Sequence, residues 1–137
     1  MTSAYVVDTH ALIWYLTDSP KLSSVARELL QRSERDDDRL LIPTIVLAEL
    51  LGLARKRKVS WPEALAALFK IDATANFEVV PFSWEDVRRI TGWLYTRTIE
   101  SSDMHDLIIL ATADRARAPL VTADRDLRAQ TVVETVW

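Results

Sequence analysis

The chain has 137 residues, of which 49% are hydrophobic and 27% charged, and this composition is typical of one globular domain spanning residues 1–137. It has no cysteine and only two glycines, which excludes disulfides, thiolate metal sites, a cysteine nucleophile and glycine-rich phosphate loops. The net charge of −3 would disfavour nucleic acid as a partner, but it decides nothing if several carboxylates bind metal.

The first half of the chain alternates strand and helix patterns. Ala4–Val7 is apolar and rich in β-branched residues, as is typical of a strand buried on both faces. Thr9 is placed to cap a helix that runs through Leu16. Further along, the patterns predict an amphipathic helix over 23–34, a strand over 40–42, a helix capped by Thr44 that continues to about residue 56, and a helix opened by the capping box Ser60-Trp61-Pro62-Glu63.

The second half repeats the alternation. Strands are expected over 77–82, 120–122 and 131–136, and helices after the capping box Ser83–Asp86, from Asp103 to about Arg115, and over 124–130. Strands that alternate with helices predict an α/β domain with a central, mostly parallel sheet and helices on both faces. In such a sheet the ligand site lies at the carboxyl ends of the strands.

No apolar run approaches the ~20 residues that span a bilayer. The N-terminus also lacks the basic flank of a signal peptide, and the absence of thiols fits a reducing compartment. We therefore expect a soluble cytoplasmic protein without a membrane partner.

Two acidic residues follow predicted strands. Asp8 ends the first strand, and Asp124 follows the strand over 120–122. Each is equally well placed to cap the next helix, and Asp126 competes with Asp124 for any ligand role. Because the ends of parallel strands meet at one edge of a sheet, Asp8 and Asp124 are nevertheless candidates for one site.

Two further acids lie on apolar helices. Glu49 is flanked, at three and four residues on either side, by apolar or small residues, which places it on the buried stripe. A carboxylate there needs an ion-pair partner or a bound cation, because burying an unpaired charge costs several kcal/mol, on the order of 3–5. Asp106 opens the apolar segment 107–113, although with Asp103 as cap it also fits a variant of the capping box.

Four carboxylates that converge would repel one another strongly in a low-dielectric site. A hard divalent cation resolves that repulsion, since Mg²⁺ or Mn²⁺ prefers oxygen ligands and retains several waters. Such a site activates water and stabilises the transition state of phosphodiester hydrolysis.

The stretches that carry these acids resemble the PIN domain, and most closely the VapC-type toxin nucleases. They are Val6-Val7-Asp8-Thr9, Ile45–Leu50, Asp103–Ala113 and Leu120-Val121-Thr122-Ala123-Asp124. The resemblance implies a three-layer PIN-like fold and a Mg²⁺-dependent endoribonuclease, with Mn²⁺ as a possible substitute, whose products carry a 5′-phosphate and a 3′-hydroxyl. It also implies homodimerisation and inhibition by a cognate antitoxin. Position by position, it suggests that Asp8, Glu49, Asp106 and Asp124 are the catalytic and metal-binding residues, with Thr122 as a supporting hydroxyl.

Two other functions remain open at this point. One is a PIN-like module that binds RNA or a protein partner without cutting. The other is a receiver-type phosphoacceptor, which also uses acids at strand ends but needs paired acids near the first strand and a lysine after a later one; the sequence offers neither clearly.

The remaining features have ordinary structural explanations. The basic cluster Arg55–Lys58 is expected to stabilise a helix C-terminus more than to bind RNA phosphates. His10 and His105 have no partner at ligand spacing and are expected to lie at caps or on the surface, so His105 is left out of the site. The apolar residues around Trp14, Tyr15 and 47–51 are expected to receive the inhibitor, unless a large core absorbs them.

Overall fold

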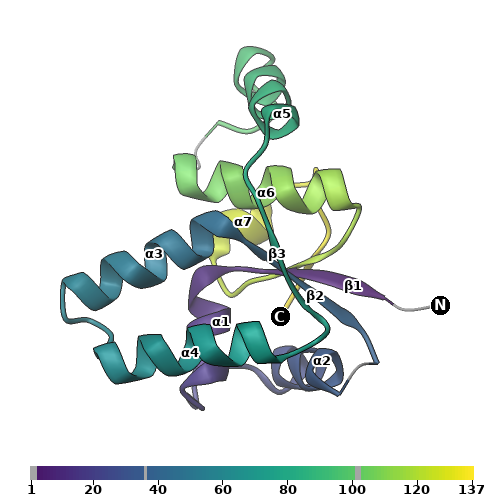
Figure 1. Ribbon diagram of the computed structural model, residues 1–137. Helices are drawn as coiled ribbons and strands as arrows, with labels where there is room; N and C mark the ends of the chain where they lie inside the picture. Colours follow the sequence, from purple (N-terminus) through teal and green to yellow (C-terminus); the bar gives the residue numbers. More distant parts are fainter. Residues whose placement is uncertain (1–2, 36, 101–102) are drawn as a thin grey trace.

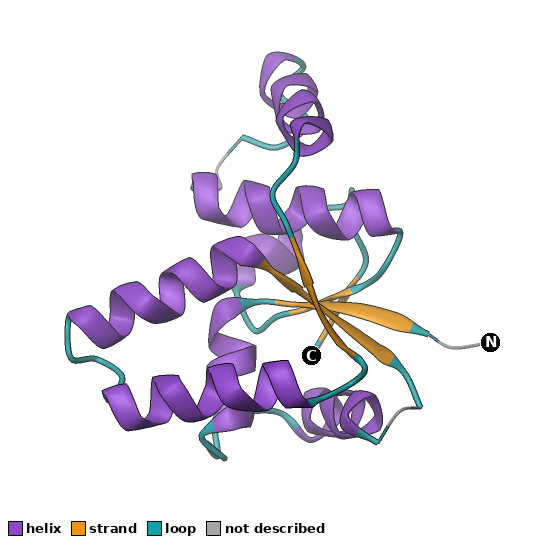
Figure 2. Cartoon of the chain, in the orientation of Figure 1, coloured by secondary structure: helices purple, strands orange, loops and turns teal. Residues whose placement is uncertain are grey.

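The computed structural model describes residues 3–35, 37–100 and 103–137, and within them the strands form one five-stranded, wholly parallel sheet in the order β3-β2-β1-β4-β5 (Figures 1 and 2). The strands are β1 Ala4–Val7, β2 Arg39–Pro43, β3 Phe77–Val80, β4 Leu120–Val121 and β5 Thr135–Val136. The helices are α1 Thr9–Leu16, α2 Ser24–Glu34, α3 Thr44–Arg55, α4 Trp61–Ala73, α5 Trp84–Tyr95, α6 Met104–Ala116 and α7 Arg125–Ala129.

The order of the strands sets the layers. The chain moves from β1 through β2 to β3 on one side, returns to β4 on the other side of β1, and ends at β5. Right-handed crossovers in these opposite directions carry α1–α4 to one face and α5–α7 to the other, and Figure 1 shows α6 across the sheet from α2 and α4. This confirms the predicted three-layer α/β fold, with a sheet that is parallel throughout.

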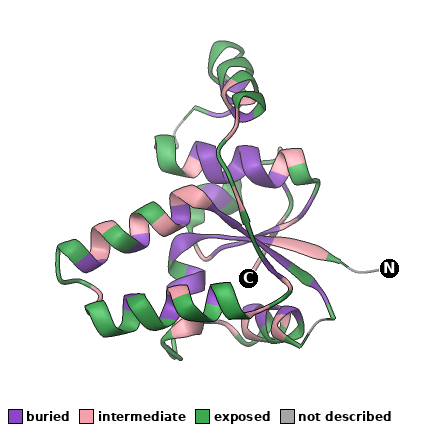
Figure 3. Ribbon diagram, viewed as in Figure 1, coloured by how far each residue is buried: buried purple, intermediate pink, exposed green. Residues whose placement is uncertain are grey.

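The core includes residues of all seven helices and of the central strands, and α6 contributes its longest buried run. All seven residues from Leu107 to Ala113 are buried, and they form the continuous buried band of this helix in Figure 3. They pack with the central strands, in which Val6, Val7, Leu120 and Val121 have no exposed surface. A helix covered on nearly all sides explains why its centre is apolar without periodicity.

Three local predictions were wrong in their details. Thr9 does not cap α1, because Asp8 is the cap and its Oδ1 accepts a hydrogen bond from Thr9 N at 2.7 Å. Thr44 does not cap α3 either; Pro43 precedes that helix without a side-chain bond, and Thr44 Oγ1 accepts from Phe82 N. The last strand begins only at residue 135.

The shortening of that strand has a physical cause in Gln130. The side chain of Gln130 accepts hydrogen bonds from the backbone N–H groups of Val132 and Val133 and donates to the carbonyl of Val133. These groups are therefore satisfied by a side chain rather than by the sheet.

None of the helices among the described residues combines the length and the apolar character that crossing a membrane requires.

Candidate active site

The site lies at the point in the sheet where the strand order reverses, between β1 and β4. Strands β1 and β4 are neighbours, with Val7 opposite Val121, and the next residues along each strand are Asp8 and Thr122. Because the chain leaves these two strands toward opposite faces, their carboxyl ends border the crevice in which α/β sheets bind ligands. Register alone thus brings Asp8 beside Thr122.

Asp8 is held rigidly by two hydrogen bonds. Its side chain accepts from Thr9 N and from the hydroxyl of Thr122, both at 2.7 Å. Asp8 is only 7% exposed, and Thr122 is fully buried. Burial raises the pKa of Asp8 above its ordinary value, while the bonds from Thr122 and Thr9 act in the opposite direction and the charge of Asp124 adds to the rise. Thr122 therefore supports the carboxylate, as the resemblance suggested.

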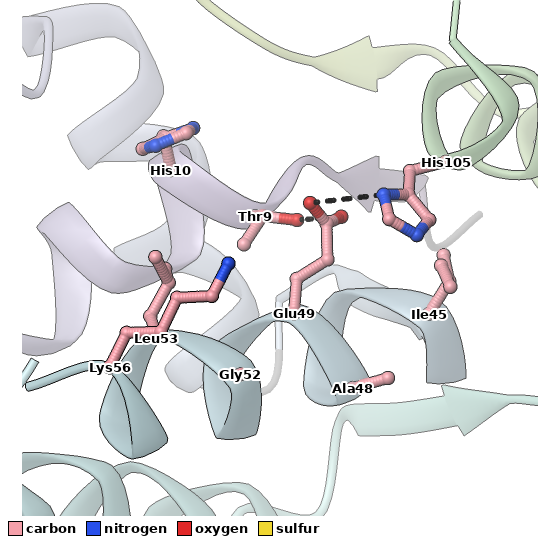
Figure 4. Close-up of a pocket in the computed structure, with 9 residues that line it drawn as sticks. All are labelled: Thr9, His10, Ile45, Ala48, Glu49, Gly52, Leu53, Lys56 and His105. Atoms are coloured by element: carbon pink, nitrogen blue, oxygen red, sulfur yellow. Dashed lines mark hydrogen bonds and ion pairs between the residues drawn. The ribbon is translucent and has the colours of Figure 1, made fainter. Parts of the chain in front are cut away.

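Glu49 enters the same crevice from α3. Its Oε1 accepts a hydrogen bond from the hydroxyl of Thr9 at 2.7 Å, and its Oε2 lies 3.9 Å from Nδ1 of His105 (Figure 4). The Glu49 side chain is 28% exposed. It is therefore less buried than we expected from the apolar residues that flank it in the sequence. Among the described residues no lysine or arginine lies within ion-pair distance of it, and the alternative of a buried ion pair with such a residue is thus not realised.

Among the four proposed acids, Asp106 has the largest shift in pKa. It lies in the first turn of α6, where its backbone N–H donates to the cap Asp103 at 2.9 Å. Burial, together with the negative charges of Asp103, Asp124, Asp8 and Glu49, raises the pKa of Asp106 to about 7. The four acids proposed from sequence therefore act on one another in the folded protein.

The fourth position separates two neighbouring aspartates. Asp124 caps α7, accepts hydrogen bonds from the backbone of Asp126 and Leu127, and donates its own N–H to Thr122 Oγ1 at 3.1 Å. Asp124 raises the pKa of both Asp8 and Asp106, and it lines one hollow together with Asp8. Asp124 thus lies at the same hollow as Asp8, and Asp126 lies in the first turn of α7.

Three residues at the site lie outside the set proposed from sequence. Asp103 is the charge with the largest effect on Asp106, Thr9 binds Glu49, and His105 faces Glu49. The sequence indicated Asp103 as the cap of the helix that begins just before Asp106. Thr9 and His105 become neighbours of Glu49 only through the packing of α3 against α1 and α6.

The donor set fits a hard divalent cation. Every acid supplies carboxylate oxygens, and the raised pKa of Asp106 reflects negative charge that no cation balances. Within the described residues, no three acidic or histidine side chains already stand close enough to enclose one ion. Mg²⁺ does not require such a cage, because it is usually held by one or two carboxylates, waters and substrate phosphates.

Two hollows flank the acids and share His10. One, of about 280 Å³, lies between α1 and α3, and its lining includes Thr9, Glu49, Gly52, Lys56 and His105 (Figure 4). The other, of about 250 Å³, is lined by Asp8, His10, Trp14, Ala123 and Asp124. Glu49 therefore lines the first hollow, and Asp8 and Asp124 line the second.

The comparisons with known proteins agree with this arrangement. Residues 5–132 match the family model described as the PIN domain. No curated protein sequence matches the chain.

Solved structures with the same fold include three VapBC or VapC proteins. VapBC2 from Rickettsia felis, crystallised with a DNA fragment from its promoter, is 19% identical, with 97% of each chain covered and a TM-score of 0.67. VapC20 from Mycobacterium tuberculosis, titled a sarcin–ricin loop cleaving toxin, is 16% identical over 95% of this chain and 98% of that one, with a TM-score of 0.70. VapBC-1 from nontypeable Haemophilus influenzae is 20% identical over 97% and 96%, with a TM-score of 0.69.

Proposed function

This chain belongs to the PIN domain family, and from that membership and its acidic crevice we propose that it is a metal-dependent endoribonuclease of the VapC toxin type. It would hydrolyse RNA phosphodiesters and be held inactive by a cognate antitoxin. Three structural neighbours with the same fold are titled as members of VapBC or VapC systems, which supports the choice of this branch of the family.

The observation that carries the proposal is the unbalanced negative charge around Asp106. Four other carboxylates raise its pKa beyond the effect of burial, and such an arrangement destabilises the fold unless a cation offsets it. Mg²⁺ or Mn²⁺ held by Asp8, Glu49, Asp106 and Asp124 would supply an activated water and neutralise charge that develops on the phosphate.

The side chains around Asp8 determine how it presents its carboxylate. Thr122 and the N–H of Thr9 fix both oxygens of Asp8, while the Thr9 hydroxyl fixes one oxygen of Glu49. Residues 8 and 9 are consecutive, so one turn of backbone orients two of the proposed ligands. This preorganisation keeps the donors in place when the anionic substrate arrives.

Cleavage of RNA by the purified protein tests the proposal. We expect structured and single-stranded RNA to be cut with Mg²⁺ or Mn²⁺ to products with a 5′-phosphate and a 3′-hydroxyl, and to remain intact with EDTA or with Asp8→Asn. A structured hairpin is included because the target of one neighbour is named as the sarcin–ricin loop. Binding of RNA without cleavage in any divalent metal would instead favour a non-cutting PIN-like module.

The proposed inhibition by an antitoxin rests on the same negative charge of the acids around Asp106. A net-negative crevice binds an arginine or lysine presented by another chain, which would displace the metal. Expression of the chain should slow growth in a manner that requires Asp8, and the small reading frame next to its gene should restore growth. Of the patch expected from sequence to receive the inhibitor, Trp14, Tyr15 and Leu47 are partly buried and pack against the core, whereas Leu51 is 43% exposed.

A homodimer is a further part of the proposal. Helix α5 leaves Trp84 69% and Tyr95 89% exposed, and large apolar side chains on a surface are typical of interfaces. Sedimentation of the purified protein measures the mass directly, and a monomer at all concentrations would contradict this part alone.

A further inference from the structure

The hollow between α1 and α3 contains a cation that the acidic site does not use. Glu49 and Gly52 of α3 and Lys56, the residue that follows its last turn, are spaced three and four residues apart and line the same hollow. In Figure 4 the amino group of Lys56 points into the hollow, toward Thr9 and Glu49. Of the basic cluster Arg55–Lys58, Lys56 is the residue that lines this hollow.

Lys56 is available to a ligand. Its side chain is exposed, and among the described residues no carboxylate lies within 4.0 Å of its amino group. An RNA strand that approaches the site meets the charges of at least four carboxylates, which repel its phosphates. A lysine at the rim of that crevice offsets the repulsion for the phosphate that lies over it.

Gly52 is an independent observation in favour of a ligand in the hollow. It lies in the last turn of α3, still within the helix, where glycine is less favourable than alanine. A Cβ atom added to Gly52 would have no atom within 4 Å, so packing within the chain does not require glycine there. The missing side chain instead leaves space on the floor of the hollow, between Glu49 and Lys56.

Building on the proposed function, we propose that this hollow is a subsite for the sugar–phosphate backbone of the RNA substrate. Lys56 binds a phosphate next to the scissile one, and Gly52 leaves the room that the backbone needs. The contact is to phosphate and therefore independent of base sequence. Lys56 thus helps to position the strand over the acids.

Binding of a labelled single-stranded oligoribonucleotide tests the role of Lys56. The measurement uses Asp8→Asn protein, so that the RNA is not cut, over a series of salt concentrations with Mg²⁺ present. Lys56→Gln should weaken binding roughly fivefold and reduce the slope of log K against log salt by about 0.7, the value for one phosphate contact on a single strand. Lys56→Arg should retain most of the affinity.

Lys58→Gln is the matched control, since it removes one charge from the same basic cluster but outside the hollow. Equal losses in Lys56→Gln and Lys58→Gln would overturn the subsite and leave the proposed nuclease intact, provided that the wild-type protein still cuts. No cleavage by the wild type and no binding by any variant would overturn both.

A methylphosphonate scan locates the contact. Replacing one phosphate near the cleavage site by a neutral methylphosphonate should slow cleavage by the wild type at one neighbouring position. At that position the replacement should have no additional effect in Lys56→Gln, because the same contact is already lost. Additive losses at every position would contradict a direct contact.

Gly52→Ala tests the open floor, with Gly92→Ala as its control. A Cβ at Gly92, in the last turn of α5, also has no atom within 4 Å, so both variants should raise the melting temperature by about 2–5 °C. Only Gly52→Ala should raise KM for RNA severalfold. If Gly52→Ala is stabilised but its KM for RNA is unchanged, the RNA backbone does not need the space that Gly52 leaves.

Discussion

Two aspartates on the α5–α6 side of the molecule differ in burial and in their surroundings. Asp86, on α5, has no exposed surface, and Arg115 of α6 donates to both of its oxygens at 2.8 and 3.2 Å. Asp106, at the start of α6, is less buried but is surrounded by four other acids that raise its pKa to about 7. The more buried carboxylate is the one whose charge is balanced.

The difference teaches which property marks a functional carboxylate. Asp86 completes the capping box of α5 with Ser83 and ties that helix to α6 through Arg115, which explains its burial in structural terms. Among the residues that the structure describes, no lysine or arginine lies within ion-pair distance of Asp106 or of the acids around it. Unbalanced charge rather than burial therefore identifies the site, and the two regions should respond to substitution in opposite ways.

The largest expected effect is loss of cleavage in the acidic site. Asp8→Asn, Glu49→Gln and Asp106→Asn should each lower kcat/KM for RNA by roughly 100-fold or more. Each should leave the metal-free melting temperature level or higher, because repulsion is relieved. Wild-type rates in Asp8→Asn or Asp106→Asn at the same metal concentration would remove the residue from the site.

The opposite pattern is expected at Asp86. Removing one partner of a buried ion pair costs about 3 kcal/mol, so Asp86→Ala should lower the melting temperature by roughly 10 °C. Cleavage per folded molecule, measured well below the transition, should not change. A variant that replaces both Asp86 and Arg115 by apolar residues should recover much of the stability, and loss of activity without loss of stability in Asp86→Ala would break the comparison.

The sequence predicted the fold because its local signals agree with one another. The capping box at Ser83 forms as expected, and the apolar runs become buried strands. It also predicted the meeting of Asp8 with the residues after β4, since parallel strands bring their ends together. These are consequences of register, which the pattern of elements determines.

The sequence could not predict contacts that depend on how helices pack. The hydrogen bond from Thr9 to Glu49 joins residues 40 positions apart, and His105 and Lys56 come to the same hollow from α6 and α3. The balance of Asp86 by Arg115 was likewise hidden, because the capping box already explained that aspartate. Charge balance is a tertiary property, and no spacing rule within one helix reveals it.

The dependence of stability on pH should distinguish the two regions further. The pKa of Asp106 is 3.8 when unperturbed and about 7 in the fold, so the folded state binds a proton more tightly. The associated stability is complete below about pH 4 and is lost as the pH rises through 7. In EDTA, the advantage of Asp106→Asn in melting temperature should therefore grow between about pH 5 and about pH 8.

Differential scanning fluorimetry across that range measures the effect, with Asp86→Asn as a variant outside the acidic cluster. Saturating Mg²⁺ should reduce the slope in the wild type, because a bound cation favours the ionised acids. A difference between Asp106→Asn and wild type that stays constant with pH would show that repulsion at Asp106 is absent.

The smallest expected effect on cleavage is that of Asp126→Asn, with the same substitution at Asp124 as its comparison. Asparagine caps helices as well as aspartate does, so Asp124→Asn keeps the bonds to the backbone N–H groups of Asp126 and Leu127 and removes only the charge. It should therefore lose cleavage without unfolding. Asp126→Asn removes a charge from the exposed first turn of α7, where an acid contributes about 0.5 kcal/mol, and should leave kcat/KM within about twofold of wild type. Loss of cleavage in Asp126→Asn but not in Asp124→Asn would move the fourth ligand two residues along the chain, to Asp126.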